Sequence, residues 1–389
     1  MITQFHVQNY KALRDITLPL TPIHVLIGPN DSGKTSILEA IAALCRSAEY
    51  PLDKIFPGTS NLPDLLWDTL GDDTVSLGAQ IVDDAITGEY RIRCTVAAGA
   101  AGPRLAEEVW IPNGQQPISF PPAGVITNLL ISRVEGRGGM DRTLAKQLYD
   151  ALSGVVLFRW NPRLLKLPVV LDAAHRLSMD SSGFGLAQCL DDLLGLDRER
   201  FRKLETKFCE IFPEMKSVQL RSVNAYQWPQ LNVAEDLPRA ASVTGKGIYF
   251  ELINGRSIPA AQASDGSMLV LAYLTLLHLP DPPRVILVEE PENGIHPRRL
   301  GEVLNILRQL IASQKRTQII MTTHSPYLLD LFKPEEVTLC RKEPGLSVSV
   351  HPLGLIPDIK KQLGVFNLGE IWTAEGDEAL AKARADGKQ

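Results

Sequence analysis

The stretch Ile27-Gly-Pro-Asn-Asp-Ser-Gly-Lys-Thr-Ser36 decides the fold of this chain. It matches the spacing G-x-x-x-x-G-K-[ST] at Gly28, Gly33, Lys34 and Thr35. An apolar run precedes the stretch and a helix-like segment, 36–44, follows it. Strand, glycine loop and helix, in that order, is the context in which this pattern forms a phosphate site. A chance glycine loop with a surface lysine is the alternative, and the correct flanks disfavour it.

The loop predicts how a nucleotide would be held. Backbone N–H groups of such a loop converge on phosphate oxygens, and the helix N-terminus favours negative charge. Lys34 is expected to reach the β- and γ-phosphates, and the Thr35 hydroxyl to bind Mg²⁺. The loop residues expected to contact the nucleotide are Gly28, Asn30, Ser32, Gly33, Lys34, Thr35 and Ser36. We therefore predict a site for ATP and Mg²⁺.

The composition is that of a soluble globular protein. The 389 residues, 44% hydrophobic and 22% charged, suffice for two or three packed lobes. A net charge of −5 gives no global basic field, so any nucleic-acid contact requires a local patch. The five cysteines show no zinc-binding or CxxC spacing. With no signal-peptide pattern and no apolar run long enough for a membrane, we expect a cytoplasmic protein.

A second group of chemically active residues follows the apolar run 285–288. Glu289 and Glu290 stand at its end. Ligands of open α/β sheets bind beyond the carboxyl ends of the strands, so both carboxylates are expected there. Glu289 is predicted to hold Mg²⁺, directly or through water, and Glu290 to orient and deprotonate the attacking water. Two exposed loop glutamates would be the ordinary alternative, but they seldom end a wholly apolar strand.

Two further motifs are weaker. His324 follows another apolar strand, 317–321, and at that position it is predicted to sense the γ-phosphate rather than to fill a core. Ser264-Asp265-Gly266 precedes an apolar helix and offers a hydroxyl and backbone N–H groups to an anion. The same tripeptide is also an ordinary turn and helix cap.

The middle of the chain carries less information. Gln80, in a predicted strand, is either a residue that approaches Mg²⁺ or, as we favour, a glutamine that faces solvent. Segment 184–212 predicts two amphipathic helices, the second with a mixed-charge face that we interpret as solvated rather than nucleic-acid binding. Sustained heptads do not occur, which argues against a coiled-coil arm.

Taken in order, these motifs resemble the ABC-type ATPase heads of the RecF, SMC and OLD families. Residues 28–35 match the Walker A loop and 285–290 the Walker B strand, while 263–268 resemble a degenerate signature motif. The resemblance implies an α/β fold: an ABC-type P-loop NTPase head with a mixed sheet core, an N-terminal antiparallel β portion and an inserted α+β/helical lobe. The implied division is 1–45 with 262–355 as the ATPase core, 46–261 as the insertion and 356–389 as a tail.

The resemblance also implies a mechanism. Two heads would pair on ATP, each nucleotide lying between one Walker A loop and the partner's Ser264 and Gly266. Lys34, Glu290 and His324 would be the catalytic residues, with Thr35 and Glu289 on the metal. Glu289 departs from the aspartate that many ABC proteins place there, although a longer carboxylate still reaches a metal.

Three functions are compatible with these motifs to different degrees. The favoured one is a homodimeric ATPase switch that controls a protein effector in DNA repair or phage defence. The alternative is a RecF-like ATPase that clamps DNA directly. A transporter subunit is disfavoured, because about 220 residues separate the first helix from the signature-like turn. Residues 372–378 resemble the start of a Toprim nuclease domain, but we expect no nuclease in this chain because too few residues follow.

Overall fold

The structure is a computed structural model. It describes residues 1–56, 62–68, 71–96, 102–120, 140–229, 238–314 and 316–386. The chain forms two compact units. The first comprises Met1–Leu157, Pro283–Val288 and Arg316–Gln389, and the second comprises Phe158–Pro282 and Glu289–Lys315. The division predicted from the motifs has other boundaries and stays a prediction.

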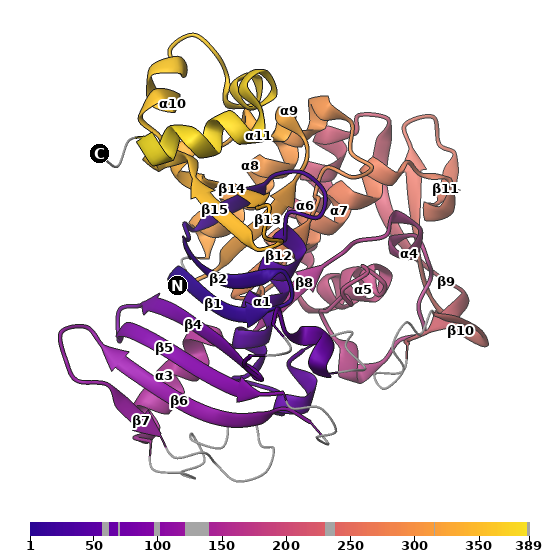
Figure 1. The fold of residues 1–389 in the computed structure, drawn as a ribbon. Helices are drawn as coiled ribbons and strands as arrows, with labels where there is room; N and C mark the ends of the chain where they lie inside the picture. Colours follow the sequence, from indigo (N-terminus) through magenta and orange to yellow (C-terminus); the bar gives the residue numbers. More distant parts are fainter. Residues whose placement is uncertain are drawn as a thin grey trace. The chain divides into compact units, whose positions relative to one another are not determined.

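An antiparallel sheet opens the first unit (Figure 1). Its strands, in the order β2-β1-β4-β5-β6-β7, are Leu13–Pro19, Ile2–Tyr10, Thr74–Val82, Thr87–Thr95, Arg104–Pro112 and Ile118–Phe120. The strands alternate apolar and polar side chains, as a sheet covered on one face requires. In β1, for example, Phe5 and Val7 are buried whereas Gln4 and Gln8 are exposed. The predicted N-terminal antiparallel portion is therefore present.

A mixed sheet forms the other layer of the first unit. Its order is β15-β14-β3-β13-β12-β8, with bounds Val348–Pro352, Val337–Lys342, Ile23–Ile27, Gln318–Thr323, Val285–Glu289 and Val155–Phe158. Strands β13 and β14 lie parallel to β3, and β15 is antiparallel to β14. All five residues of β3 are buried, as expected for a strand covered on both faces. The mixed sheet core predicted from the sequence is confirmed.

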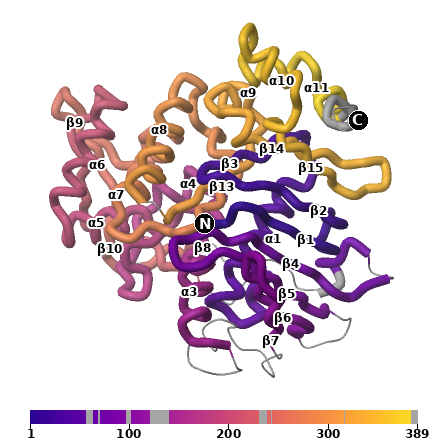
Figure 2. The backbone as a smooth tube through the Cα atoms, turned by 90° about the vertical axis from the view of Figure 1, so that its left-hand side faces the viewer, coloured from indigo at the N-terminus to yellow at the C-terminus, as the bar shows by residue number. Residues whose placement is uncertain are grey.

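Helix α1, Lys34–Arg46, lies in the core of the first unit. It contacts β1 and β4 of the antiparallel sheet and β13 of the mixed sheet, so both layers pack on it (Figure 2). Gln318 ties the two sheets together, because its side chain accepts from the Ile2 amide at 3.0 Å and donates to the Ile2 carbonyl at 2.8 Å. The other α-helices in the described part of this unit are α3 Arg142–Leu152, α9 Pro326–Leu329, α10 Pro357–Gln362 and α11 Leu368–Asp386.

The second unit combines helices with a three-stranded antiparallel sheet. The helices are α4 Pro162–Leu165, α5 Leu186–Leu196, α6 Arg198–Ile211, α7 Asp265–His278 and α8 Pro297–Ser313, and the strands are β9 Met215–Gln227, β10 Arg239–Leu252 and β11 Ser257–Pro259. Helix α7 packs against α4, α6 and α8, and ten of its residues are buried. Over the part of the chain that the structure describes, no helix has the length and apolarity needed to cross a membrane.

Candidate nucleotide-binding site

The glycine loop between β3 and α1 is shaped by close contacts that only glycine permits. Gly28 has φ +137° and Gly33 has φ +84°, both outside the range that other residues readily adopt. A β-carbon on Gly33 would lie 2.5 Å from a methyl group of Val348 in β15. Burial raises the pKa of the neighbouring Cys340 thiol to about 12, despite the opposing charge of Lys34, so this cysteine stays protonated.

The Lys34 ammonium group is buried within the loop. It donates to the carbonyl oxygens of Gly28 at 2.8 Å and Pro29 at 2.7 Å, and more distantly to the Ser32 hydroxyl at 3.4 Å. The side chain is only 6% exposed. A buried ammonium is costly unless compensated, and here loop oxygens supply the compensation. The loop thus concentrates one positive charge at the point where the sequence predicts phosphates.

Helix α1 begins in a way that leaves its N-terminus available to an anion. Its cap, Gly33, makes no side-chain hydrogen bond, and the first turn carries no acidic residue. By contrast, Asp141 caps α3 and Asp197 caps α6 with side-chain oxygens. The first amides of a helix need acceptors, and a phosphate supplies them. Of the predicted loop contacts, Asn30 and Thr35 are exposed, Ser36 is half-buried, and Ser32 is buried.

His324 lies beside the glycine loop in the mixed sheet. Thr323, the last residue of β13, is paired with Ile27, the last residue of β3. His324 and Gly28 therefore leave adjacent parallel strands at the same level. His324 is half-buried, and the turn after it is held by the Ser325 amide, which donates to the Thr323 hydroxyl at 3.0 Å. The structure thus brings together two sites separated by almost 300 residues of sequence.

Glu289 ends β12 and is already paired. The Arg159 guanidinium donates through Nε to Glu289 Oε2 at 2.6 Å and through Nη2 to Oε1 at 3.3 Å. Strands β8 and β12 are neighbours in the sheet, and these two residues stand at their ends. Sequence analysis did not identify Arg159. The apolar run 155–158, which precedes Arg159, indicates the end of a strand but not which strand lies beside it.

Glu290 has a left-handed backbone conformation. Its φ is +46°, which is uncommon for a residue with a side chain and is found where the surroundings enforce it. Asn293 enforces it here, because its backbone amide donates to the Glu290 carbonyl at 3.0 Å and its side-chain amide donates to Glu290 Oε2 at 2.5 Å. The carboxylate predicted to be catalytic is therefore held by a turn, 290–293, rather than free on a loop.

The signature-like turn lies against the turn after β12. A β-carbon on Gly266 would be 3.2 Å from the Gly294 carbonyl oxygen. Ser264 is exposed and caps α7, accepting from the Ser267 amide at 3.1 Å, so the ordinary capping role is present. Asp265 pairs with Lys166 at 2.6 Å. In the second unit, the signature-like turn 263–268 and the turn after β12 are therefore in contact, and Ser264 is exposed.

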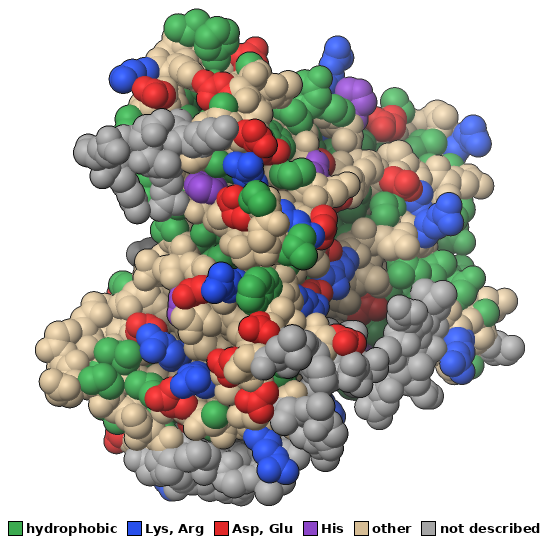
Figure 3. Space-filling view, viewed as in Figure 1, with side chains coloured by type: hydrophobic (Ala, Val, Ile, Leu, Met, Phe, Trp, Pro, Cys, Tyr) green, Lys and Arg blue, Asp and Glu red, His purple; other side chains and the backbone are tan. Residues whose placement is uncertain are grey.

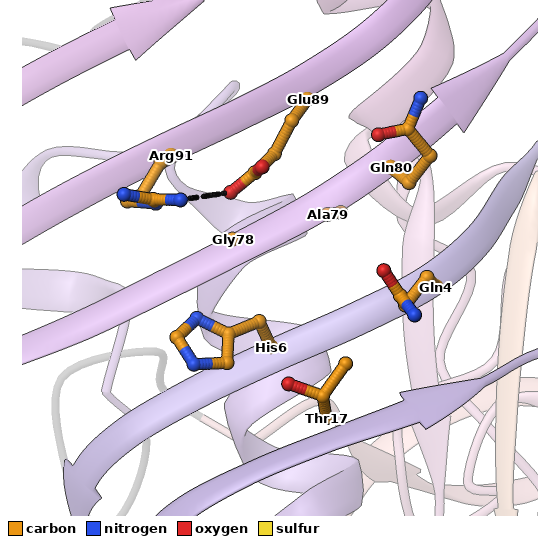
Figure 4. A pocket seen from close by; sticks show the side chains of 8 residues that line it. All are labelled: Gln4, His6, Thr17, Gly78, Ala79, Gln80, Glu89 and Arg91. Carbon is orange, nitrogen blue, oxygen red and sulfur yellow. Dashed lines mark hydrogen bonds and ion pairs between the residues drawn. The ribbon is translucent and has the colours of Figure 1, made fainter. Parts of the chain in front are cut away.

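Gln80 is a half-buried residue of β4 in the antiparallel sheet. Figure 4 shows it with Gln4 at the edge of a polar hollow of about 250 Å³ that also includes His6, Thr17, Glu89 and Arg91. Its side-chain amide donates to Asn113 Oδ1 at 3.0 Å. Ion pairing between Arg91 and Glu89, at 2.6 Å, closes part of the hollow. These contacts favour the interpretation of Gln80 as a surface strand residue.

Comparison with known proteins gives two matching domain families. Residues 1–87 match the family described as "AAA ATPase domain", and residues 155–330 match "AAA domain, putative AbiEii toxin, Type IV TA system". The chain is 24% identical to the OLD nuclease of Thermus scotoductus over 365 residues, which are 88% of this chain and 62% of that protein. A 49-residue stretch, 13% of this chain and 19% of the relative, is 45% identical to the L-cystine transport system ATP-binding protein TcyN of Escherichia coli.

Solved structures of SMC heads share the fold. An SMC head bound to the C-terminal winged-helix domain of ScpA aligns with a TM-score of 0.54 and 16% identity, covering 92% of this chain and 99% of that one. An SMC head with an extended coiled coil, bound to a ScpA domain derived from Pyrococcus furiosus, aligns with a TM-score of 0.51 and 12% identity over 93% and 99%. Together these matches confirm the resemblance predicted from the sequence, to an ABC-type ATPase head of the RecF, SMC and OLD group.

Proposed function

We propose that this chain binds and hydrolyses ATP with Mg²⁺, pairs with a second copy when ATP is bound, and thereby controls a protein effector. The observation that carries the proposal is the glycine loop of the first unit. It combines a buried Lys34 ammonium with an α1 N-terminus that has neither a side-chain cap nor an acidic residue. Both features favour bound phosphate groups over any neutral ligand.

The proposal includes a nucleotide-bound magnesium ion, with Thr35 and Glu289 as its predicted protein ligands. The Thr35 hydroxyl is exposed in the first turn of α1, and Glu289 adds a carboxylate at the end of β12. Magnesium prefers such oxygens and is commonly held by one or two protein ligands together with phosphates. When bound, it would neutralise phosphate charge. Lys34 would orient the phosphates, Glu290 would accept a proton from the attacking water, and His324 would contact the γ-phosphate.

Pairing of two copies is proposed from the second unit. Ser264 is exposed at the start of α7, where its side chain caps the helix and Asp265 adds a negative charge. The proposal that Ser264 and Gly266 meet the nucleotide of another copy therefore rests on the resemblance of 263–268 to a signature motif. ATP drives pairing only as far as it binds the paired state more tightly than the separate one. Control of an effector follows as a proposal from the resemblance, and the solved SMC heads bound to ScpA domains are examples of heads with a protein partner.

Surface charge favours a protein effector over direct DNA binding. Acidic and basic side chains are interspersed on the face shown in Figure 3. In the first unit, Arg93 lies 3.8 Å from Glu107, and Arg91 is likewise paired with Glu89. Phosphate backbones are bound by uncompensated Lys and Arg, whose charge these carboxylates reduce. Direct DNA clamping is nevertheless an outcome that the experiment below can report.

Binding of a fluorescent ATP analogue to wild type and to Lys34→Ala tests the first step. We expect the variant to lose binding by at least about 100-fold, because the charge that faces the phosphates is removed. Lys146→Ala is the matched control, since Lys146 forms an exposed pair with Asp150 in α3 of the same unit. Equal affinity of Lys34→Ala and wild type would overturn the nucleotide site.

A pull-down with the Glu290→Gln variant from cells of its native host, in ATP and Mg²⁺, tests whether the partner is a protein or DNA. The bound material is compared before and after nuclease digestion. A stoichiometric protein that survives digestion supports the effector proposal. Recovery of DNA without a stable protein would replace it with the DNA clamp.

A further inference from the structure

The pair between Arg159 and Glu289 has the geometry of a strong charge-assisted contact. Two guanidinium nitrogens reach two different carboxylate oxygens, at 2.6 Å and 3.3 Å. Such two-pronged pairs are stronger and more directional than contacts through a single atom. Glu289 is 20% exposed and Arg159 is 43% exposed, so the carboxylate is the more enclosed partner. Arg159 therefore neutralises a largely enclosed negative charge.

The backbone around Arg159 is fixed while its side chain reaches solvent. The Arg159 amide donates to the Ser181 carbonyl at 2.7 Å, and the Asn161 amide donates to Ser182 at 2.8 Å. Trp160, between them, packs against Phe158 and Tyr273 with ring centroids 4.9 Å and 4.5 Å apart. A change of the Arg159 rotamer would therefore displace the guanidinium group without displacing the backbone that carries it.

Two cations would compete for the same carboxylate if Glu289 binds magnesium. Direct coordination requires an oxygen at about 2.0–2.1 Å from the ion in near-octahedral geometry. Both Glu289 oxygens are engaged by Arg159. Each oxygen keeps a second lone pair that a metal could use, but a guanidinium and Mg²⁺ on one carboxylate would repel each other, so metal binding favours release of Arg159.

We propose that Arg159 is a positioning residue that exchanges with the metal: it holds Glu289 before magnesium arrives and releases it when magnesium binds. The inference rests on the proposed nucleotide function and adds a predicted energetic consequence. Since its positive charge opposes that of the metal, Arg159 weakens metal binding while keeping Glu289 aligned. Removal of its charge therefore strengthens the affinity of the nucleotide-bound protein for a divalent ion.

Binding of Mn²⁺ to the ADP-saturated protein, followed by electron paramagnetic resonance, measures this affinity without turnover. We expect Arg159→Gln to bind Mn²⁺ at least about threefold more tightly than wild type, a change of about 0.6 kcal/mol. Arg163→Gln is the matched control, because Arg163 is an exposed arginine in α4. Unchanged or weaker Mn²⁺ binding in Arg159→Gln would overturn the proposal.

Repeating the measurement in the Glu289→Gln variant distinguishes competition for the Glu289 carboxylate from a general effect of the Arg159 charge. In Glu289→Gln, where the attraction for Arg159 is lost, the additional change Arg159→Gln is expected to leave Mn²⁺ affinity unaltered. The same gain in both backgrounds would contradict exchange at this carboxylate. Affinity for ADP in EDTA is measured first, so that a failure of nucleotide binding itself is distinguished from a failure of the Arg159 inference. Arg159→Met, which also removes the charge, replaces Arg159→Gln in these measurements should that variant fold poorly.

Discussion

The carbonyl oxygen of Cys340 lies 2.1 Å from the position that a β-carbon on Gly28 would occupy. Cys340 lies in β14 and Gly28 directly follows β3, and these two strands run parallel. The close approach sets the position of the glycine loop on its sheet. Any side chain at residue 28 would push β14 and the loop apart.

Gly28→Ala is therefore expected to destabilise the protein as well as to weaken nucleotide binding. Overpacking of this kind costs about 1–3 kcal/mol. Gly114→Ala is the control, because Gly114 also has a positive φ of +70° but has no atom within 4 Å of the added β-carbon. That change should cost only the backbone strain, about 1 kcal/mol. Urea unfolding of both variants checks the difference, and equal losses would show that the contact with Cys340 is unimportant.

Glu290→Gln is expected to retain ATP binding and to lose at least about 100-fold in hydrolysis, since amides do not accept the proton of an attacking water. The substitution preserves size and leaves an oxygen for Asn293. Phosphate release under single-turnover conditions measures the loss. Glu302→Gln, at an exposed position of α8, should hydrolyse ATP at the wild-type rate. Turnover by Glu290→Gln close to that of wild type would remove Glu290 from the mechanism.

Ser264→Arg is expected to prevent ATP-dependent pairing without affecting nucleotide binding by the single copy. A bulky cation would occupy the exposed start of α7, where the partner's nucleotide is proposed to lie. Loss of the cap would also cost about 1 kcal/mol. Ser264→Asn preserves capping and serves as the control for that loss. Light scattering with ATP and the Glu290→Gln background measures the mass, and an intact ATP-dependent dimer of Ser264→Arg would contradict the proposed contact.

His24 is expected to make stability depend on pH. Burial lowers the pKa of this β3 histidine to about 4, and its ring contacts the hydroxyls of Thr21 at 3.1 Å and Thr338 at 3.0 Å. The unfolded chain takes up a proton near pH 6.5, before the folded protein does. Stability is therefore complete above pH 6.5 and falls towards pH 4, by about 3 kcal/mol in all.

Urea unfolding of wild type and His24→Gln between pH 4 and pH 7.5 measures this dependence. Between pH 6.5 and pH 4, the unfolding free energy of the variant should fall less steeply with pH than that of wild type, whatever its stability at neutral pH. Identical slopes in the two proteins would show that other groups account for the dependence.

The two ends of the chain were predictable because their motifs fix strand, loop and helix together. Strand β3, the loop and α1 occur where the pattern around Gly28 and Lys34 indicates, and β13 ends beside His324 as predicted. The hairpin of the second unit was underestimated. Runs 217–223 and 247–253 predicted short strands, whereas β9 and β10 extend over 215–227 and 239–252. The additional residues are held by cross-strand pairing, and their polar side chains weaken the alternation that reveals a strand.

Arg159 could not be assigned from the sequence for a different reason. It lies 130 residues from Glu289, and the contact depends on β8 being placed beside β12. No local pattern encodes that sheet order. The turn that holds Glu290 is local, by contrast, and Asn293 was within reach of sequence analysis. Its role was missed because the left-handed conformation of a glutamate is not signalled by residue type.

Because α1 begins without a side-chain cap, the stability of the folded protein is also expected to depend on ligand concentration. A phosphate that satisfies those amides binds the folded chain and not the unfolded one, so melting temperature should rise with nucleotide concentration. At 100 times the dissociation constant the gain is about 2.7 kcal/mol. A dye-based thermal shift screen over nucleoside mono-, di- and triphosphates would then rank ligands without a catalytic assay. In the cell, the lifetime of this protein against proteolysis would rise and fall with its nucleotide supply.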